Sequence, residues 1–118
     1  MERAVPILPV DDLAQARRFY VDTLGFAVRF AWSPDGAAGL LGVQRGGLVL
    51  TLDCPMLGHG RHACAALEVD DADRYHAEWS ARVSAIRPPR DEDWGARTFD
   101  LQDPFGNTLF VIDPAAPA

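Results

Sequence analysis

The sequence predicts an α+β fold in which one βαβββ unit occurs twice. The segments Val10-Asp11-Asp12 and Val69-Asp70-Asp71 are alike and lie 59 residues apart, which is half of the 118-residue chain. Each segment is followed by a helical pattern and then by strand-like runs, so the same series of elements is stated twice. One such unit covers only one face of its sheet. Two units must therefore combine into curved sheets around a cleft.

The chain begins with a short apolar run at residues 4–10, Ala-Val-Pro-Ile-Leu-Pro-Val. Its two prolines cannot donate a backbone hydrogen bond, which excludes a central strand. The run is therefore predicted to be an edge strand or an arm that is exchanged with a second chain.

A helix is predicted after each Val-Asp-Asp segment. Asp12 can cap the first helix, with Gln15 three residues later as in a capping box, and Gly25 ends it. Apolar residues then recur at i, i+3, i+7 and i+11 in both halves, which places them on one helical face. They are Leu13, Ala16, Tyr20 and Leu24 in the first half and Ala72, Tyr75, Trp79 and Val83 in the second. We assign Tyr20 and Trp79 to the core.

Three strand-like runs follow the first helix. One run precedes the second helix, and two more follow it. The expected strands are residues 26–32, 40–43, 48–52, 62–69, 96–101 and 108–112. Turn residues separate them, above all in Asp103-Pro104-Phe105-Gly106-Asn107 before the last strand. The chain is thus expected to be one domain, 1–118, with repeats of about 3–57 and 61–113.

Composition excludes several classes of function. The net charge of −6 argues against a nucleic-acid partner, which would need a basic surface, and no window approaches the roughly 20 apolar residues of a membrane span. The first ten residues lack the apolar core of a signal peptide, so a cytoplasmic protein is expected. Cys54 and Cys64 have neither disulfide-framework nor zinc-motif spacing.

These elements resemble the vicinal-oxygen-chelate superfamily, which contains glyoxalase I, extradiol dioxygenases, fosfomycin-resistance enzymes and bleomycin-resistance proteins. The resemblance rests on the βαβββ repeat and on three motifs: Val10-Asp11-Asp12-Leu13, Leu24-Gly25-Phe26 after Phe19-Tyr20, and the Asp103–Asn107 turn. Three further segments resemble the bleomycin-resistance proteins in particular. They are Ala4-Val5-Pro6, Tyr75-His76-Ala77-Glu78-Trp79-Ser80 and Trp94-Gly95.

Enzymes of this superfamily hold a divalent metal with one residue from each of four strands, usually His or Glu. The resemblance places those positions on Val5, Thr51, Cys64 and Phe110. Valine and phenylalanine offer no lone pair, threonine is a poor ligand, and one thiol cannot hold a hard cation. We therefore expect no metal, no other cofactor and no catalytic residue.

An alternative remains open. A metal-dependent lyase, isomerase or dioxygenase could use a displaced site at His62, Cys64 and Asp53. The remaining histidines are expected at the surface, His59 in a glycine-flanked loop and His76 on the polar face of the second helix.

The resemblance implies a metal-independent homodimer with exchanged N-terminal strands. Such a dimer sequesters a cationic, partly aromatic antibiotic of the bleomycin type in grooves between its two chains. The implied ligand-binding residues are three aromatics and two carboxylates: Trp94, Phe30, Trp32, Asp91 and Asp93. A third reading is a ligand-sensing module with no role in resistance.

Each of these residues also has a plainer explanation. Trp94 could cover the edge of its own hairpin, and Phe30 could belong to the core. The acidic run from Asp91 to Asp93 could be a solvated loop.

Overall fold

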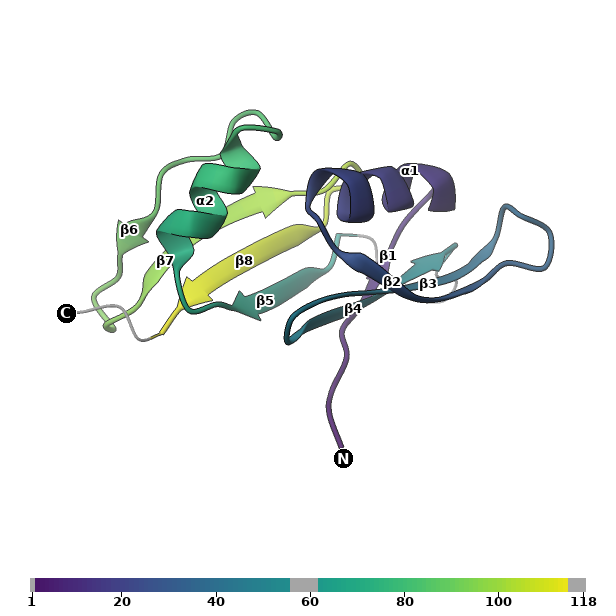
Figure 1. Cartoon of the computed structure of the whole chain (residues 1–118), viewed down its shortest axis with the longest axis horizontal. Helices are drawn as coiled ribbons and strands as arrows, with labels where there is room; N and C mark the ends of the chain where they lie inside the picture. Colours follow the sequence, from purple (N-terminus) through teal and green to yellow (C-terminus); the bar gives the residue numbers. More distant parts are fainter. Residues whose placement is uncertain (1, 56–61, 115–118) are drawn as a thin grey trace.

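Two βαβββ units build the protein, as the sequence predicts, and each forms a four-stranded sheet with its helix on one face (Figure 1). A computed structural model describes residues 2–55 and 62–114. The first unit contains β1 (Ile7–Pro9), α1 (Leu13–Arg17), η1 (Arg18–Thr23), β2 (Ala27–Trp32), β3 (Gly39–Arg45) and β4 (Leu48–Cys54). The second contains β5 (Cys64–Glu68), α2 (Ala72–Ser80), β6 (Arg90–Asp91), β7 (Arg97–Gln102) and β8 (Thr108–Asp113). The strand orders are β1-β4-β3-β2 and β5-β8-β7-β6.

The register of the strands repeats with the sequence offset. β1 runs parallel to β4 with Ile7 opposite Thr51, and β5 runs parallel to β8 with Ala66 opposite Phe110. Each residue of the second pair stands 59 positions after its counterpart, which confirms the internal repeat. The predicted repeat ends at residues 57 and 61 lie outside the described residues.

The two helices begin in the same way. The Asp12 carboxylate accepts a hydrogen bond from the Gln15 backbone N–H at 3.0 Å, and Asp71 accepts one from Arg74 at 3.1 Å. Asp12 is the N-cap that the sequence predicts, and Asp71 occupies the matching position 59 residues later.

The helices end differently. The first continues as the wider η1 turn, and its C-cap residue, Leu24, is followed by Gly25 at a φ of +82°. The second stops at Ser80, so the prediction that Val83 extends that helix is wrong. Val83 lies in the following turn, where its N–H donates to the Trp79 carbonyl at 2.8 Å.

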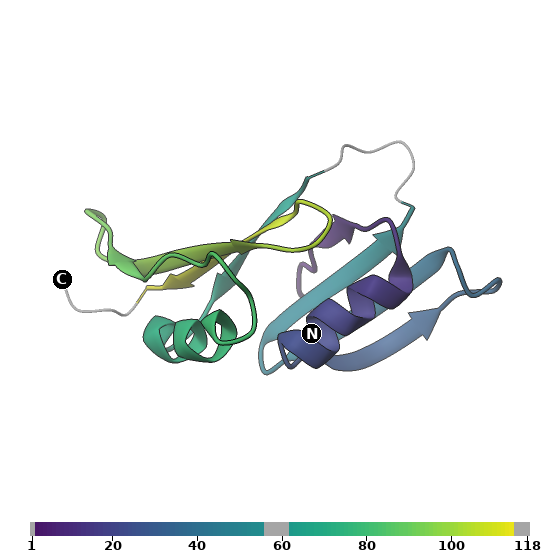
Figure 2. The same cartoon turned by 90° about the horizontal axis from the view of Figure 1, so that it is seen from above.

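The core lies between each helix and its sheet. Tyr20 and Trp79 are fully buried, which confirms their assignment to the core. Along β4 the buried residues alternate with half-buried ones such as Thr51 and Asp53, which point to the other side of the sheet. We call the face of each sheet that carries no helix the open face. Figure 2 shows each helix lying on one side of its own sheet.

Arg45, at the end of β3, joins the two units. Its Nη2 donates to Glu78 Oε1 on α2 at 2.8 Å, and its Nη1 donates to the Leu24 carbonyl at 2.7 Å. The guanidinium carbon also lies 4.7 Å from the centre of the Tyr75 ring. Trp79 Nε1 shares the Leu24 carbonyl at 3.0 Å, so the end of the first helix is tied to the second.

The apolar run at the start of the chain forms β1 at the edge of its sheet, as the two prolines predict. It pairs with β4 of its own chain. The residues before β1 leave the body on the side away from both helices (Figure 1). An exchange of this segment with a second chain stays a prediction. Within residues 2–55 and 62–114, no helix is long and apolar enough to cross a membrane.

Candidate functional site

A bulge in β2 directs two aromatic side chains to the open face of the first sheet. Val28 pairs with Val43 and packs against the core, whereas Phe30 pairs with Gly42. In a regular strand residues 28 and 30 would share a face, so the extra residue between them moves Phe30 to the other side. Trp32, two residues on, shares the open face with Phe30. Their exposed fractions are 40% and 59%, and the explanation of Phe30 as a core residue is wrong.

Gly42 fixes how Phe30 lies. A Cβ placed on Gly42 would come within 2.3 Å of the Phe30 ring, a distance that real Cβ atoms do not show. The ring therefore rests directly on the backbone of β3. Phe30 is held as a flat platform on the sheet, and only glycine at position 42 leaves room for it.

Trp94 lies in the turn between β6 and β7, where Gly95 has a φ of +94°. Its exposed fraction is 61%, so most of its side chain is open to solvent. A flat aromatic surface of this size is open to solvent at the tip of the second unit.

The acidic residues before Trp94 are partly neutralised by arginines. Asp91 accepts a hydrogen bond from Arg97 Nη1 at 2.9 Å, and Glu92 accepts one from Arg90 Nε at 2.6 Å. The bond from Arg90 is the main cause that lowers the pKa of Glu92. Asp93 is exposed. Of the two carboxylates predicted to face a ligand, Asp91 is thus already paired with a cation of its own chain.

One chain does not bring the three aromatics together. The β2–β3 turn that follows Trp32 and the β6–β7 turn that carries Trp94 lie at opposite ends of the molecule in both views (Figures 1 and 2). The molecule is 49 Å long on its longest axis. Phe30 and Trp32 form one aromatic surface and Trp94 another.

The four superfamily metal positions do not fit a divalent cation. Thr51 and Phe110 lie on the open faces opposite Ile7 and Ala66, so an apolar side chain stands beside each of them. Cys64 begins β5, and Val5 precedes β1. Across the described part of the chain, no three His, Cys, Asp or Glu side chains gather closely enough to hold a metal ion.

The displaced site is not assembled either. Asp53 belongs to β4 of the first unit and Cys64 to β5 of the second. The His62 ring instead lies over Gly106, where a Cβ would come within 2.3 Å of its Nδ1.

His76 differs from its prediction as a surface residue. It is half-buried, and its ring meets Phe99 edge-on with 5.4 Å between ring centres. Its Nε2 is buried and has no hydrogen-bond partner among the described residues. The helical pattern missed this because the α2 face toward β7 is wider than the stripe of four apolar residues. His59 lies outside the described residues.

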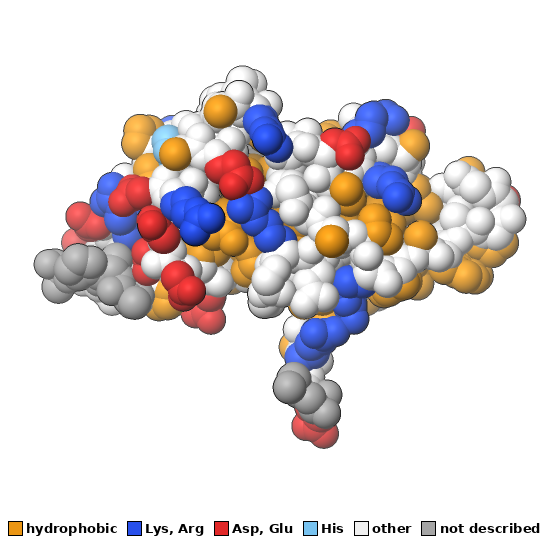
Figure 3. Space-filling view, in the orientation of Figure 1, with side chains coloured by type: hydrophobic (Ala, Val, Ile, Leu, Met, Phe, Trp, Pro, Cys, Tyr) orange, Lys and Arg blue, Asp and Glu red, His pale blue; other side chains and the backbone are white. Residues whose placement is uncertain are grey.

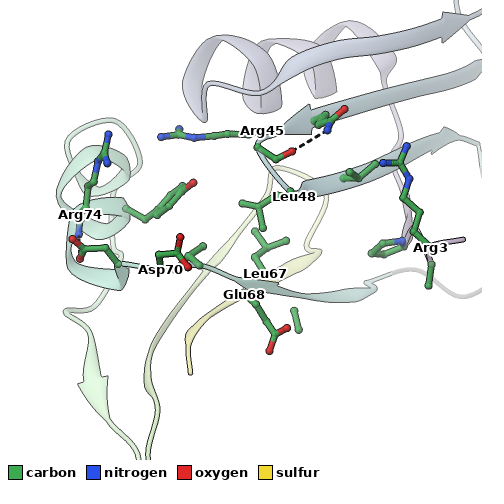
Figure 4. Close-up of a pocket in the computed structure, with 17 residues that line it drawn as sticks. Arg3, Arg45, Leu48, Leu67, Glu68, Asp70 and Arg74 are labelled. Carbon is green, nitrogen blue, oxygen red and sulfur yellow. Dashed lines mark hydrogen bonds between the residues drawn. The ribbon is translucent and has the colours of Figure 1, made fainter. Parts of the chain in front are cut away.

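Sequence reasoning also missed a cavity of about 700 Å³ where the two units meet. It lies between the β3–β4 turn, β5, the start of α2 and the segment before β1. Figure 4 shows Arg3 and Arg74 at opposite ends of it, with Glu68 and Asp70 between them. Its charges are of both signs and do not converge on one point, so it offers no defined ion site.

Comparison with known proteins identifies the family. The model of the glyoxalase/bleomycin resistance protein/dioxygenase superfamily matches residues 3–111. The chain belongs to this superfamily. A comparison with curated proteins gave no match.

Solved structures of superfamily members share the fold over nearly the whole chain. A bleomycin-binding protein complexed with bleomycin is 27% identical, with a TM-score of 0.77 and coverage of 96% of this chain and 98% of that one. The bleomycin resistance determinant encoded on transposon Tn5 is 26% identical, with a TM-score of 0.79 and the same coverage. The bleomycin-binding protein of bleomycin-producing Streptomyces verticillus, complexed with copper(II)-bleomycin, is 31% identical, with a TM-score of 0.74 and 94% of both chains covered.

Proposed function

We propose that this superfamily member is a homodimeric, metal-independent cytoplasmic protein that sequesters a cationic, partly aromatic antibiotic of the bleomycin type. The observation that carries the proposal is the exposure of three large aromatic side chains, Phe30, Trp32 and Trp94. The similarity to bleomycin-binding proteins supports it.

Exposed aromatic rings favour a planar ligand for a physical reason. A ring that stacks on Trp94 or Phe30 removes apolar area from water and gains contact between the two π-systems. Each carboxylate near the rings would favour a cation, and Asp93 is available beside Trp94. Sequestration needs binding but no chemical step.

A dimer accounts for the separation of the aromatics. The two aromatic surfaces lie at opposite ends of one chain, so a two-fold axis can place Trp94 of one copy near Phe30 and Trp32 of the other. Figure 3 shows hydrophobic side chains gathered over the half that carries β2 and β3, where a second copy would approach. The segment before β1, which leaves the body, is suited to reach that copy.

Calorimetric titration with metal-free and with copper(II)-loaded bleomycin tests the proposal. We expect saturable binding at micromolar concentration or tighter, with one site for each Trp94. Trp94→Ala should weaken binding about tenfold, since removing an aromatic anchor costs more than about 1 kcal/mol. Gln15→Ala is the matched control, because it removes an exposed side chain on α1 and leaves the capping backbone N–H in place.

Three results would contradict the proposal. The first is no binding of either form of bleomycin at micromolar concentration, and the second is equal binding by wild type and Trp94→Ala. The third is a stoichiometric metal that stays with the purified protein through dialysis. Sedimentation equilibrium separately tests the dimer, which should have twice the mass of the chain.

A further inference from the structure

A pocket of about 490 Å³ opens at one end of the first sheet, beside Trp32. Trp32 pairs with Leu40, and Leu40 pairs with Asp53, so the three lie in one row across β2, β3 and β4. The β2–β3 turn and the end of β4 close the sides. We call this the Trp32 pocket; it is lined by Trp32, Pro34, Asp35, Ala38, Gly39, Leu40, Asp53, Cys54 and Pro55.

Among the described residues that line the pocket, the charged side chains are two carboxylates, Asp35 and Asp53. Asp35 is engaged in its own turn, where it accepts hydrogen bonds from the N–H groups of Ala37 and Ala38 at 2.8 and 2.9 Å. Asp53 is half-buried, and its carboxylate has no hydrogen bond or ion pair with any residue in 2–55 or 62–114. A carboxylate without a partner at the edge of an apolar pocket can accept a charge-assisted hydrogen bond from a cation.

The surroundings of the pocket are negative as well. Burial raises the pKa of the Cys54 thiol, and the charges of Asp12, Asp11 and Asp53 raise it further. Several carboxylates therefore act on the same point at the end of β4. Among the described residues that line the pocket, none carries a positive charge.

We propose that the Trp32 pocket binds a planar hydrophobic group carrying an amidinium or ammonium, with the ring against Trp32 and Leu40 and the cation at Asp53. This inference rests on the proposed function. It specifies which part of the ligand the first sheet would bind. The volume is in the range of small-molecule sites and accepts two fused rings. The pocket is complementary to such a group, because the pocket walls are apolar and the Asp53 carboxylate is negative.

The test uses 2-naphthamidine and 2-naphthamide, which have the same shape and differ in charge. The three tryptophans each give one indole N–H signal in a ¹H–¹⁵N correlation spectrum, and single tryptophan variants assign them. 2-Naphthamidine should shift the Trp32 signal and bind about tenfold more tightly than 2-naphthamide, as one charge-assisted hydrogen bond allows. Asp53→Asn should remove that difference. Glu68→Gln, which alters an exposed carboxylate on β5 of the second unit, should keep it.

Each other outcome overturns the proposal. Equal affinity for the two compounds means that Asp53 does not select a cation. Shifts at Trp94 alone place the cation in the other aromatic surface. No shift at Trp32, with that indole shielded from solvent in the free protein, means that a second copy of the chain covers the pocket.

Failure here is distinguishable from failure of the proposed function. If bleomycin binds wild type and Asp53→Asn equally, antibiotic sequestration stands and the role of the Trp32 pocket falls. If bleomycin does not bind at all, the 2-naphthamidine titration still decides what the pocket accepts.

Discussion

Tyr20 Oη donates a hydrogen bond to Asp103 Oδ2 at 2.7 Å, and both residues are buried. Tyr20 belongs to the first helix and Asp103 to the turn before β8, so the bond joins the two units through the core. Asn107 Nδ2 donates to the same carboxylate oxygen at 2.8 Å, and also to the Pro9 carbonyl at 2.7 Å. The other Asp103 oxygen accepts from the backbone N–H groups of Phe105 and Asn107. The Asp103–Asn107 turn thus connects the two units by buried hydrogen bonds.

Replacing Tyr20 measures how much its hydrogen bond to Asp103 contributes to stability. Tyr20→Phe keeps the ring in the core and removes one of the donors to a buried carboxylate. We expect the free energy of unfolding to fall by about 1–3 kcal/mol in urea denaturation at pH 7. Tyr75→Phe is the control. Because Tyr75 is only half-buried, this substitution should lower the free energy of unfolding by less than Tyr20→Phe does. An unchanged midpoint for Tyr20→Phe would mean that the bond contributes nothing to stability.

The same hydroxyl predicts a loss of stability in alkali. Burial raises the pKa of Tyr20 well above its ordinary value of 10.0, and the Asp103 charge raises it further. Above about pH 10 the unfolded chain releases this proton while the folded protein keeps it, so stability falls as pH rises. The slope for one such group is at most about 1.4 kcal/mol per pH unit.

Urea denaturation between pH 8 and pH 11 measures this slope. Tyr20→Phe should lose less stability over that range than wild type does, whereas Tyr75→Phe should retain the loss that Tyr20 causes. The measurement is favourable because the chain has no lysine: all 11 basic residues are arginines, which do not titrate there. Parallel curves for wild type and Tyr20→Phe would refute the assignment.

The repeated fold could be predicted from the sequence because its signals are local. Helix caps at Asp12 and Asp71 and apolar spacing around Tyr20 and Trp79 each depend on neighbours within a few turns. The two-residue strand β6 could not be predicted, since Arg90 and Asp91 carry no apolar alternation.

The candidate site was predicted less completely. Trp32 and Trp94 are exposed, and their role in ligand binding stays a prediction. The pairing of Asp91 with Arg97 could not be predicted, because it depends on a contact across β6 and β7. The bulge that turns Phe30 outward depends on strand pairing, which no periodicity in the sequence reports. The turn residue Asp103 was recognised by its local chemistry, and its long-range partner Tyr20 was not.

The ion pair between Arg45 and Glu78 predicts a dependence on acid. The hydrogen bond from Arg45 is the main cause that lowers the pKa of Glu78 below its ordinary 4.5. This contribution to stability is therefore present above pH 4.5 and is lost as the pH falls through the lowered folded-state value. The Glu78 side chain is 34% exposed, so solvent screening limits the pair to about 1 kcal/mol or less.

Glu78→Gln measures that contribution. Its stability should lie below that of wild type at pH 7, and the difference should shrink as the pH falls below 4.5 in urea denaturation. Glu68→Gln removes an exposed carboxylate on β5, and should stay within about 0.5 kcal/mol of wild type at pH 7. A Glu78→Gln deficit that is the same at pH 7 and pH 3.5 would show that the charge of Glu78 is not its source.

Gly42 should control ligand affinity through Phe30. Gly42→Ala places a methyl group where the Phe30 ring lies, so the ring must tilt off the sheet. We expect bleomycin affinity to fall about three- to tenfold, which corresponds to about 0.7–1.4 kcal/mol of lost stacking. Gly47→Ala is the matched control, because an added Cβ there meets no atom within 4 Å. Calorimetry on both variants decides the matter: if Gly42→Ala binds bleomycin as tightly as Gly47→Ala does, the flat Phe30 platform has no part in recognition.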